Sequence, residues 1–232
     1  MTLTVHGVKV PIEATEVSPV VWEALASGTY EAKEARWITK CVRPGDRVLE
    51  LGSGIGVVTT LIAAIPDVRV WAYEANPLTV ALARRVLEAN AIANVTLRQG
   101  VLTAGASKDL PFYIRADLWM SSMDEKQGPY LKVVQLASSD IDAFVSRNEI
   151  DVLVMDIEGA ERDLLQNAEL PGVDRIFLEL HDHLYGLAGI RDITQALAEK
   201  GFGYDPRGSS GPCVLFSRDD APRAYQEEAE WA

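Results

Sequence analysis

The sequence has little of what membrane proteins, disulfide-rich proteins and metal-cluster proteins are built from. Its 232 residues include only 2 cysteines and 3 histidines. Neither Cys41 nor Cys213 has a neighbour at a spacing typical of a metal or redox pair, so we expect free thiols in a reducing compartment. No apolar run is long enough to span a bilayer, and the N-terminal segment has neither a basic region nor an apolar signal core. These absences predict a cytoplasmic protein with no membrane partner.

Positive charge is also scarce. The chain has 34 Asp and Glu residues against 22 Lys and Arg, which gives a formal net charge of −12. Phosphate backbones repel such a chain, so we expect no nucleic-acid partner. Hydrophobic residues make up 48% of the sequence, enough for a full core, and the length fits one larger α/β domain. The sequence leaves a homodimer open.

One glycine-rich turn organises the rest of the chain. Residues 47–56 read Arg-Val-Leu-Glu-Leu-Gly-Ser-Gly-Ile-Gly, an apolar run that ends in glycines and continues directly into a helical pattern. This order predicts a strand, a tight turn and a helix start whose free amides face a ligand. A dinucleotide site needs Gly-x-Gly-x-x-Gly, but Val57 stands at the position of the third glycine. A nicotinamide or flavin ligand is therefore disfavoured.

Two acidic residues near this turn indicate its ligand. Glu50 would repel a pyrophosphate, yet it could receive the ammonium group of an amino-acid moiety, which favours S-adenosylmethionine. Glu74 ends the next apolar run about 20 residues past Gly54, where such folds place an acid on ribose hydroxyls. The alternative is that both acids are ordinary strand-end charges. The expected cofactor contacts are Tyr30, Glu50, Gly52, Ser53, Gly54, Gly56, Glu74, Ala75 and Asn76.

Strands and helices alternate along the chain, which predicts a parallel sheet with right-handed crossovers. Residues 2–12 predict a hairpin around His6 and Gly7, and Asn76 is a natural N-cap for a helix. Further helices are expected from Pro19, before Arg43, and over 57–65, 77–90, 139–147, 160–166 and 190–200. Further strands are expected over 68–73, 95–99, 151–159, 173–183, 202–204 and 213–216.

The pattern divides the chain into three parts. Residues 1–46 form a flap with helices over the ligand cleft, residues 47–218 form the core, and residues 219–232 form a loosely attached tail. In the flap, Tyr30 with Glu31 and Glu34 either covers the cofactor cleft or belongs to a solvated helix face with one packed aromatic ring.

One long connection, residues 103–137, interrupts the alternation of strands and helices. A connection of this length is usually functional or forms its own hairpin. It carries Phe112, Trp119 and Tyr130 and is the best candidate for substrate contacts. An excursion that covers one sheet edge, with Trp119 packed inward, is equally compatible with the sequence.

Several segments occur in the same order as similar elements of the FkbM family of S-adenosylmethionine-dependent methyltransferases. They are residues 28–31, the glycine turn with Glu50, residues 74–77, Ser121 with Ser122, Asp-Ile-Glu-Gly-Ala-Glu at 156–161, and Glu-Leu-His at 179–181. The sequence resembles the family over most of residues 28–183. It departs at Met155, where the family commonly has Lys, and at Glu50, where Asp is more frequent. The resemblance implies a class I, Rossmann-like seven-stranded methyltransferase sheet with helices on both faces, and methyl transfer to a hydroxyl of a sugar or natural product.

A hydroxyl nucleophile asks for a base within hydrogen-bond reach. The carboxyl edge of the sheet offers Asp156, Glu158 and His181 as catalytic candidates, and we expect Asp156 or His181 to be the base and Glu158 to be a second acid near the methyl donor. Alternatively, Glu158 and Glu161 favour a helix start and His181 packs at a strand end. A divalent ion could be ligated by Asp156, Glu158, His181 and His183 together. No fixed metal spacing is present, so we predict catalysis without a metal.

The function that fits these patterns best is O-methylation of a small-molecule or glycan acceptor with S-adenosylmethionine. Two alternatives are a nicotinamide-dependent oxidoreductase on a similar sheet and a non-catalytic protein that kept the cofactor pocket. The oxidoreductase would want the missing third glycine, and a non-catalytic protein would leave Glu50 and Glu74 without a purpose.

Overall fold

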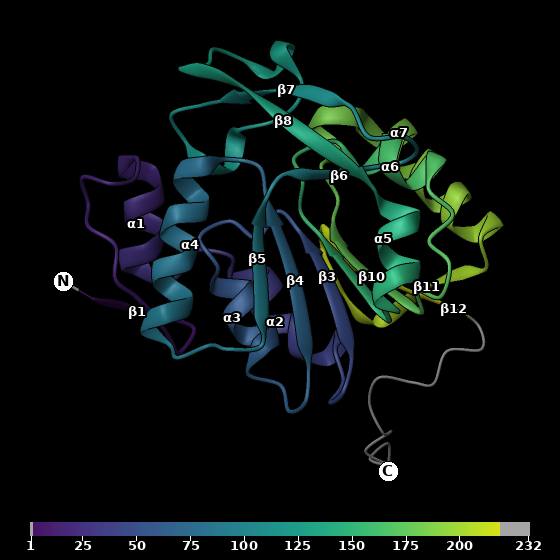
Figure 1. Cartoon of the computed structure of the whole chain (residues 1–232), viewed down its shortest axis with the longest axis horizontal. Helices are drawn as coiled ribbons and strands as arrows, with labels where there is room; N and C mark the ends of the chain where they lie inside the picture. The colour runs from purple at the N-terminus through teal and green to yellow at the C-terminus, as the bar shows by residue number, and fades with distance from the viewer. Residues whose placement is uncertain (1, 219–232) are drawn as a thin grey trace.

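A seven-stranded sheet forms the centre of the protein, whose computed structural model describes residues 2–218 (Figure 1). The strand order across the sheet is β11 (Phe202–Ser210), β12 (Cys213–Arg218), β10 (Arg175–Glu179), β9 (Val152–Met155), β3 (Arg47–Leu51), β4 (Arg69–Glu74) and β5 (Val95–Gln99). In this sheet β12 runs in the direction opposite to the other six strands, which are parallel to one another. The predicted α/β fold class is confirmed. The tail over 219–232 lies outside the described residues.

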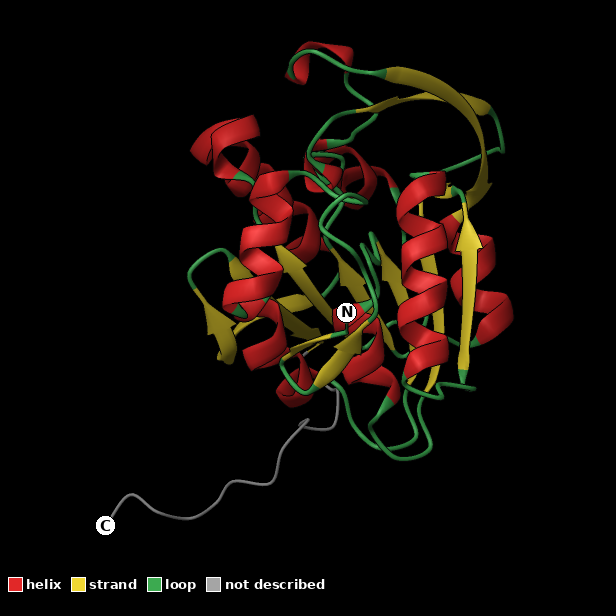
Figure 2. Ribbon diagram, turned by 90° about the vertical axis from the view of Figure 1, so that its left-hand side faces the viewer, coloured by secondary structure: helices red, strands yellow, loops and turns green. Residues whose placement is uncertain are grey.

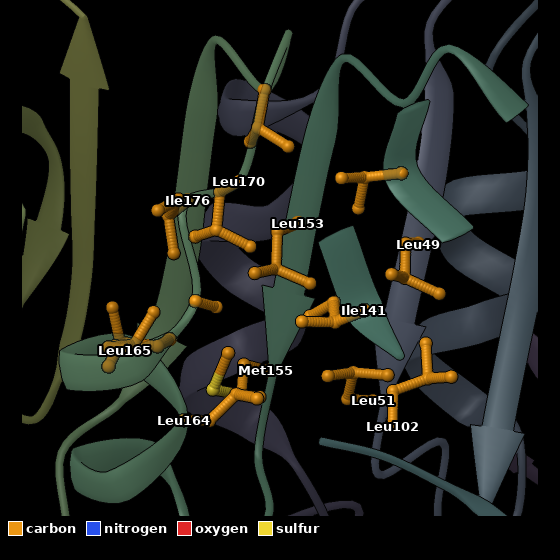
Figure 3. Packing of buried hydrophobic residues seen from close by; sticks show 14 of the residues in the cluster. Leu49, Leu51, Leu102, Ile141, Leu153, Met155, Leu164, Leu165, Leu170 and Ile176 are labelled. Atoms are coloured by element: carbon orange, nitrogen blue, oxygen red, sulfur yellow. The ribbon is translucent and has the colours of Figure 1, made fainter. Parts of the chain in front are cut away.

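Helices cover both faces of this sheet (Figure 2). The helices are α1 (Pro19–Ser27), α2 (Ala32–Cys41), α3 (Val57–Ala63), α4 (Pro77–Ala89), α5 (Ile141–Asn148), α6 (Glu161–Asn167) and α7 (Asp182–Glu199). Because successive strand residues point to opposite faces, Leu49 and Leu153 pack with α5, α6 and α7, whereas Val48 and Val152 pack with α2 and α3. Figure 3 shows the first of these layers, with Leu49, Leu153 and Ile141 meeting between sheet and helix.

The chain enters α4 through the cap that the sequence predicts. The Asn76 side chain accepts a hydrogen bond from the Leu78 N–H, and Pro77 occupies the first turn, where its missing N–H costs nothing. The cap starts α4 directly after the short loop that follows β4, and Glu74 stays at the carboxyl end of its strand.

The N-terminal hairpin is also confirmed. Strands β1 (Leu3–Val5) and β2 (Val8–Val10) pair in antiparallel fashion around His6 and Gly7, both at positive φ. Their buried valines pack with α1 and with Leu82 and Val86 of α4. The hairpin therefore anchors the segment that carries Tyr30.

Several predicted boundaries are wrong. The expected helix over 139–147 begins at Ile141, because the preceding strand continues to Asp140. The strand expected over 151–159 ends at Met155. The strand expected over 173–183 ends at Glu179, and α7 begins at Asp182 rather than 190, with a kink at Gly186 (φ 62°) that hides its first turn in the sequence. The strand expected over 202–204 extends to 210 as β11 through an irregular register.

The long connection forms a hairpin of its own, one of the possibilities named for it, and a third strand that the sequence did not predict joins this hairpin to make a three-stranded sheet. The order is β6 (Val101–Thr103), β8 (Lys132–Asp140) and β7 (Asp109–Ile114), with short 3-10 turns η1 (Leu118–Met120) and η2 (Glu125–Gln127) between β7 and β8. Arg115, 4% exposed, donates hydrogen bonds to the carbonyls of Met120 and Asp124 and so closes the loop on itself. Figure 1 shows this sheet above the end of the main sheet where β5 leads into β6.

Candidate active site

A deep pocket opens at the carboxyl ends of β3, β4 and β9, under the three-stranded sheet. The empty space in it, counted out into the open mouth, is about 840 Å³. Among residues 2–218, the lining includes four carboxylates, from Glu31, Glu74, Asp156 and Glu158, and no Lys, Arg or His. Charge and position together fit a cationic ligand at the usual binding edge of an open α/β sheet.

Two glycines of the turn lie in the pocket wall, and each is needed for a close approach. Gly52 has φ +83°, and a Cβ built there would lie 1.7 Å from the Asp156 carbonyl oxygen. A Cβ on Gly54 would lie 2.9 Å from Glu31 Oε1 and 3.0 Å from the Tyr30 hydroxyl. The turn thus touches β9 on one side and the flap on the other.

Glu74 binds the backbone of the same turn. Its Oε2 accepts a hydrogen bond from the Gly54 N–H at 3.0 Å, and its Oε1 accepts one from the Asn76 N–H at 2.8 Å. Burial raises the pKa of Glu74 to about 7, against the lowering effect of these amides. Each carboxylate oxygen keeps a lone pair for a ligand hydroxyl, as the ribose assignment requires.

Glu50 lies behind the wall instead of in it. It is 2% exposed, is absent from the pocket lining, and its Oε2 accepts a hydrogen bond from the Thr59 hydroxyl at 2.6 Å. Burial raises its pKa to about 8. In this geometry the Glu50 side chain lies behind the turn, hydrogen-bonded to Thr59, and does not face the cavity.

The other residues predicted to contact the cofactor also form two groups, those that line the pocket and those that lie behind its wall. Tyr30 and Ala75 line the pocket together with Gly52, Gly54 and Glu74. Ser53, Gly56 and Asn76 do not: a Cβ built on Gly56 would lie 3.4 Å from Ala83, and Asn76 caps α4. The local pattern identifies the turn correctly but does not separate its lining residues from its supporting ones.

The three predicted catalytic residues gather in one cluster. His181 Nε2 lies 3.4 Å from Asp156 Oδ1 and 3.5 Å from Glu158 Oε2, and its Nδ1 lies 3.1 Å from Glu161 Oε1. Burial opposes a charge on His181, but Asp156 and Glu161 outweigh it and raise its pKa to about 11. The neighbouring carboxylates therefore favour a positive charge at this position, carried either by the imidazolium or by another bound cation.

Glu161 is a buried member of this cluster. It is fully buried, and its two carboxylate oxygens accept hydrogen bonds from the Ile157 and Gly159 N–H groups at 3.0 and 2.9 Å. The carboxylate thus shapes the loop between β9 and α6 and fixes the His181 ring. The sequence analysis weighed Glu161 only as a helix-start residue; its place in the 156–161 motif was the signal.

Glu158 is the cluster member with the most unusual backbone. Its φ is +53°, a left-handed conformation that costs a non-glycine residue free energy and often marks a functional site. Gln127 of η2 donates a hydrogen bond to its carbonyl oxygen at 3.0 Å, and the side chain lines the pocket. Burial, followed by the charge of Asp156, raises its pKa to about 8.

A family model described as the methyltransferase FkbM domain matches residues 52–204, which include the turn, Glu74 and the whole cluster. The chain belongs to the FkbM methyltransferase family. Family membership confirms the expected class of enzyme and, with it, S-adenosylmethionine as the cofactor of that class. No curated protein matches the sequence.

Three solved structures that resemble this FkbM protein are remote from it in sequence. TYW2 of M. jannaschii, in complex with AdoMet, has a TM-score of 0.50 at 13% identity, over 94% of this chain and 86% of that one. Precorrin-6y C5,15-methyltransferase of Geobacter metallireducens GS-15 has a TM-score of 0.49 at 13% identity, over 84% and 82%. Fibrillarin of Aeropyrum pernix, with natively bound S-adenosyl-L-methionine, has a TM-score of 0.46 at 15% identity, over 79% and 73%. At such identities the likeness concerns the fold.

The long connection of this FkbM protein, which the sequence marks as the candidate for substrate contacts, lines part of the pocket. Leu102 of β6 and Leu118 and Met123 of the long connection form an apolar wall together with Phe112. Trp119 also lies in this wall, and its ring centre is 6.1 Å from that of Tyr30. Trp119 therefore both packs inward and faces the ligand space, so the two interpretations of this segment were not exclusive.

Among residues 2–218, no helix is long and apolar enough to cross a bilayer.

Proposed function

We propose that this protein is an S-adenosylmethionine-dependent O-methyltransferase acting on a hydroxyl group of a small molecule or glycan. The observation that carries the proposal is a single pocket with Glu74 on one wall and Glu158 on the other. The first residue suits a nucleoside ribose, and the second suits a hydroxyl that must lose its proton.

The residues of the first wall fit the cofactor. Gly52 and Gly54 leave a cradle that a Cβ would fill, Glu74 offers oxygens to the ribose hydroxyls, and the apolar side chains of Leu102 and Phe112 suit an adenine ring. Four lining carboxylates without a lining cation match a positively charged ligand. S-adenosylmethionine supplies an electrophilic methyl group on a sulfonium centre.

The residues of the second wall fit the acceptor. Glu158 faces the pocket and is the group best placed to take the hydroxyl proton, whereas His181, 5% exposed and outside the lining, lies behind Asp156 and Glu158. A base whose pKa lies near the working pH is efficient in such a transfer. The enclosing walls add positioning of the two reactants, which can supply much of the rate.

The lining also restricts the acceptor. Its carboxylates would repel a phosphate or a carboxylate close to the reacting hydroxyl, and the apolar wall favours a compact organic body. A neutral or cationic hydroxyl compound, including a sugar unit, meets both conditions, and a nucleic acid does not.

The test has two stages. Calorimetric titration should give binding of S-adenosylmethionine and its demethylated product, and none of NAD. Incubation with methyl-labelled cofactor and a panel of hydroxyl, amine and thiol acceptors should then give a labelled methyl ether. Label found on nitrogen, sulfur or carbon would refute the hydroxyl assignment, and binding of NAD alone would refute the methyltransferase.

A further inference from the structure

Three potential ligand atoms meet beside the pocket in a way that methyl transfer does not require. Asp156, Glu179 and His181 each present one oxygen or nitrogen atom, and these atoms all lie within 4.8 Å of one another. The arrangement follows from the sheet register: Leu178 pairs with Met155 in the parallel strands β10 and β9, so Glu179 and Asp156 follow at the same level. Parallel neighbours at one level point to the same face.

The imidazole is oriented toward this meeting point. His181 Nδ1 lies at an ion-pair distance of 3.1 Å from Glu161 Oε1, without a hydrogen bond of good geometry, and Nε2 lies on the side of the Asp156 carboxylate. A carboxylate behind a histidine in this way is the usual outer partner of a metal-bound imidazole, where it sets the tautomer and the ring orientation. His181 is 5% exposed, so its direction is set by packing and not by solvent.

The contacts inside the cluster are poor as hydrogen bonds. His181 Nε2 is 3.4 Å from Asp156 Oδ1, and among residues 2–218 this buried oxygen has no hydrogen-bond partner. Two ligands that are each about 2.1 Å from a tetrahedral ion lie about 3.4 Å apart. The spacing therefore suits two atoms that share an ion between them.

We propose that Asp156, Glu179 and His181 bind a divalent cation, with Glu161 as the outer carboxylate that orients the imidazole. Two carboxylates and one imidazole form a hard to borderline donor set suited to manganese, magnesium or zinc. The inference rests on the proposed function: the cation would hold the acceptor hydroxyl next to Glu158 and make its proton easier to remove. It differs from the expectation of catalysis without a metal, and it excludes His183, which is exposed on α7.

A second set of ligand atoms shares one member with the first. Glu34, Glu179 and Cys213 also lie within 4.8 Å of one another. There, however, the Cys213 thiol donates a hydrogen bond to Glu34 Oε1 at 3.1 Å, so both groups already have a partner. Replacing Cys213 separates the two sets experimentally.

The experiment measures the binding of manganese itself to the full chain after chelation and dialysis. Calorimetry and electron paramagnetic resonance should give one bound Mn²⁺, and pulsed measurements on the unsubstituted protein should detect coupling to an imidazole nitrogen. Glu161→Gln should weaken Mn²⁺ binding 10- to 100-fold. Asp156→Asn and Glu179→Gln should weaken it at least as much, while Cys213→Ser and Glu88→Gln, an exposed carboxylate on α4, should leave it unchanged.

Three results would overturn the proposal. They are no binding of Mn²⁺, Mg²⁺ or Zn²⁺ at millimolar concentration, bound Mn²⁺ without nitrogen coupling, and variants at 156 and 179 that fold and still bind Mn²⁺ normally. Thermal unfolding in chelator identifies a variant that has simply failed to fold, and the nitrogen coupling needs no variant at all. Titration of S-adenosylmethionine in chelator tests the proposed function separately, because manganese binding without cofactor binding would refute that function and leave the cation site standing.

Discussion

The two walls of the pocket are built in opposite ways. On the β3 and β4 side, carboxylates are satisfied by the protein itself: Glu74 accepts two backbone N–H groups and Glu50 accepts the Thr59 hydroxyl. On the β9 and β10 side, Asp156 and Glu158 face the edge of one imidazole, and the Asp156 Oδ1 atom is left without a hydrogen bond by the described residues. The carboxylates of the first wall therefore have hydrogen-bond partners within the protein, whereas a ligand would supply the partner that Asp156 Oδ1 in the second wall lacks among the described residues.

The comparison also separates what each wall does. A wall of satisfied groups and close backbone contacts suits a cofactor that always has the same shape. A wall of mutually repelling carboxylates stores unfavourable electrostatic energy that a proton, a cation or a substrate can relieve. Chemistry is therefore expected on the second wall, and substitutions should affect the two walls differently.

The largest effect should come from Glu158→Gln. Loss of the proposed base should lower turnover by roughly 100- to 10,000-fold while cofactor affinity stays nearly intact. Steady-state assays on a confirmed acceptor, paired with calorimetry, would measure both quantities, and Glu88→Gln is the matched control. Unchanged turnover in Glu158→Gln would transfer the role of base to another group of the cluster.

Gly52→Ala should damage both walls at once. The new Cβ would lie 1.7 Å from the Asp156 carbonyl oxygen, so β3 and β9 could not both keep their places. We expect a loss of about 3 to 5 kcal/mol in the free energy of unfolding, the upper range for a single substitution. Urea unfolding measures it.

Gly105→Ala is the control for this substitution. Gly105 also has a positive φ, +86°, but a Cβ there would meet nothing within 4 Å. Only the backbone strain remains, about 1 kcal/mol. Equal losses in the two variants would show that the contact with Asp156 does not matter.

Glu74→Gln should affect the first wall alone. Removing a charged acceptor from the ribose hydroxyls should weaken S-adenosylmethionine binding by about 1.5 to 3 kcal/mol, or roughly 10- to 150-fold. Turnover at saturating cofactor should change far less. An affinity equal to that of the unsubstituted protein would remove Glu74 from the cofactor site.

The smallest effect should be a pH dependence of nucleoside binding. Burial raises the pKa of Glu74 to about 7, so its ionised form, which accepts hydroxyl hydrogen bonds best, grows as pH rises through that value. Methylthioadenosine, which has the ribose but no titrating amine, should bind about tenfold more tightly at pH 8 than at pH 6. Glu74→Gln should bind it equally at both; affinity that falls with rising pH would contradict the assignment.

The first wall could largely be predicted from the sequence because its parts are local. The strand, the turn, Glu74 and the cap at Asn76 follow one another within about 30 residues, and each has a spacing rule. The spacing rules do not specify how deeply a side chain is buried. They predict that Glu50 contacts the ligand, whereas the structure places its side chain behind the turn and outside the pocket lining.

The second wall could be predicted only in part because its parts meet through topology. The adjacency of Asp156 and Glu179 depends on β9 lying next to β10, which an alternating pattern does not specify. Glu161 was obscured by an equally good local explanation, the preference for acids at a helix start. The first turn of α7 was missed because Gly186 interrupts the helical period.

The three-stranded sheet has a consequence for how specificity can be changed. Its interior is a separate small cluster of Phe112, Ile114 and Leu136, and Arg115 closes its loop with internal hydrogen bonds. The hydrogen bond between Glu74 and Gly54 lies outside this sheet, although Phe112 and Trp119 also line the cofactor side of the pocket. Replacing the loop between β7 and β8 by another loop of similar length is therefore expected to change which acceptor binds. The new loop would have to supply an amide in place of Gln127, which donates a hydrogen bond to the Glu158 carbonyl oxygen.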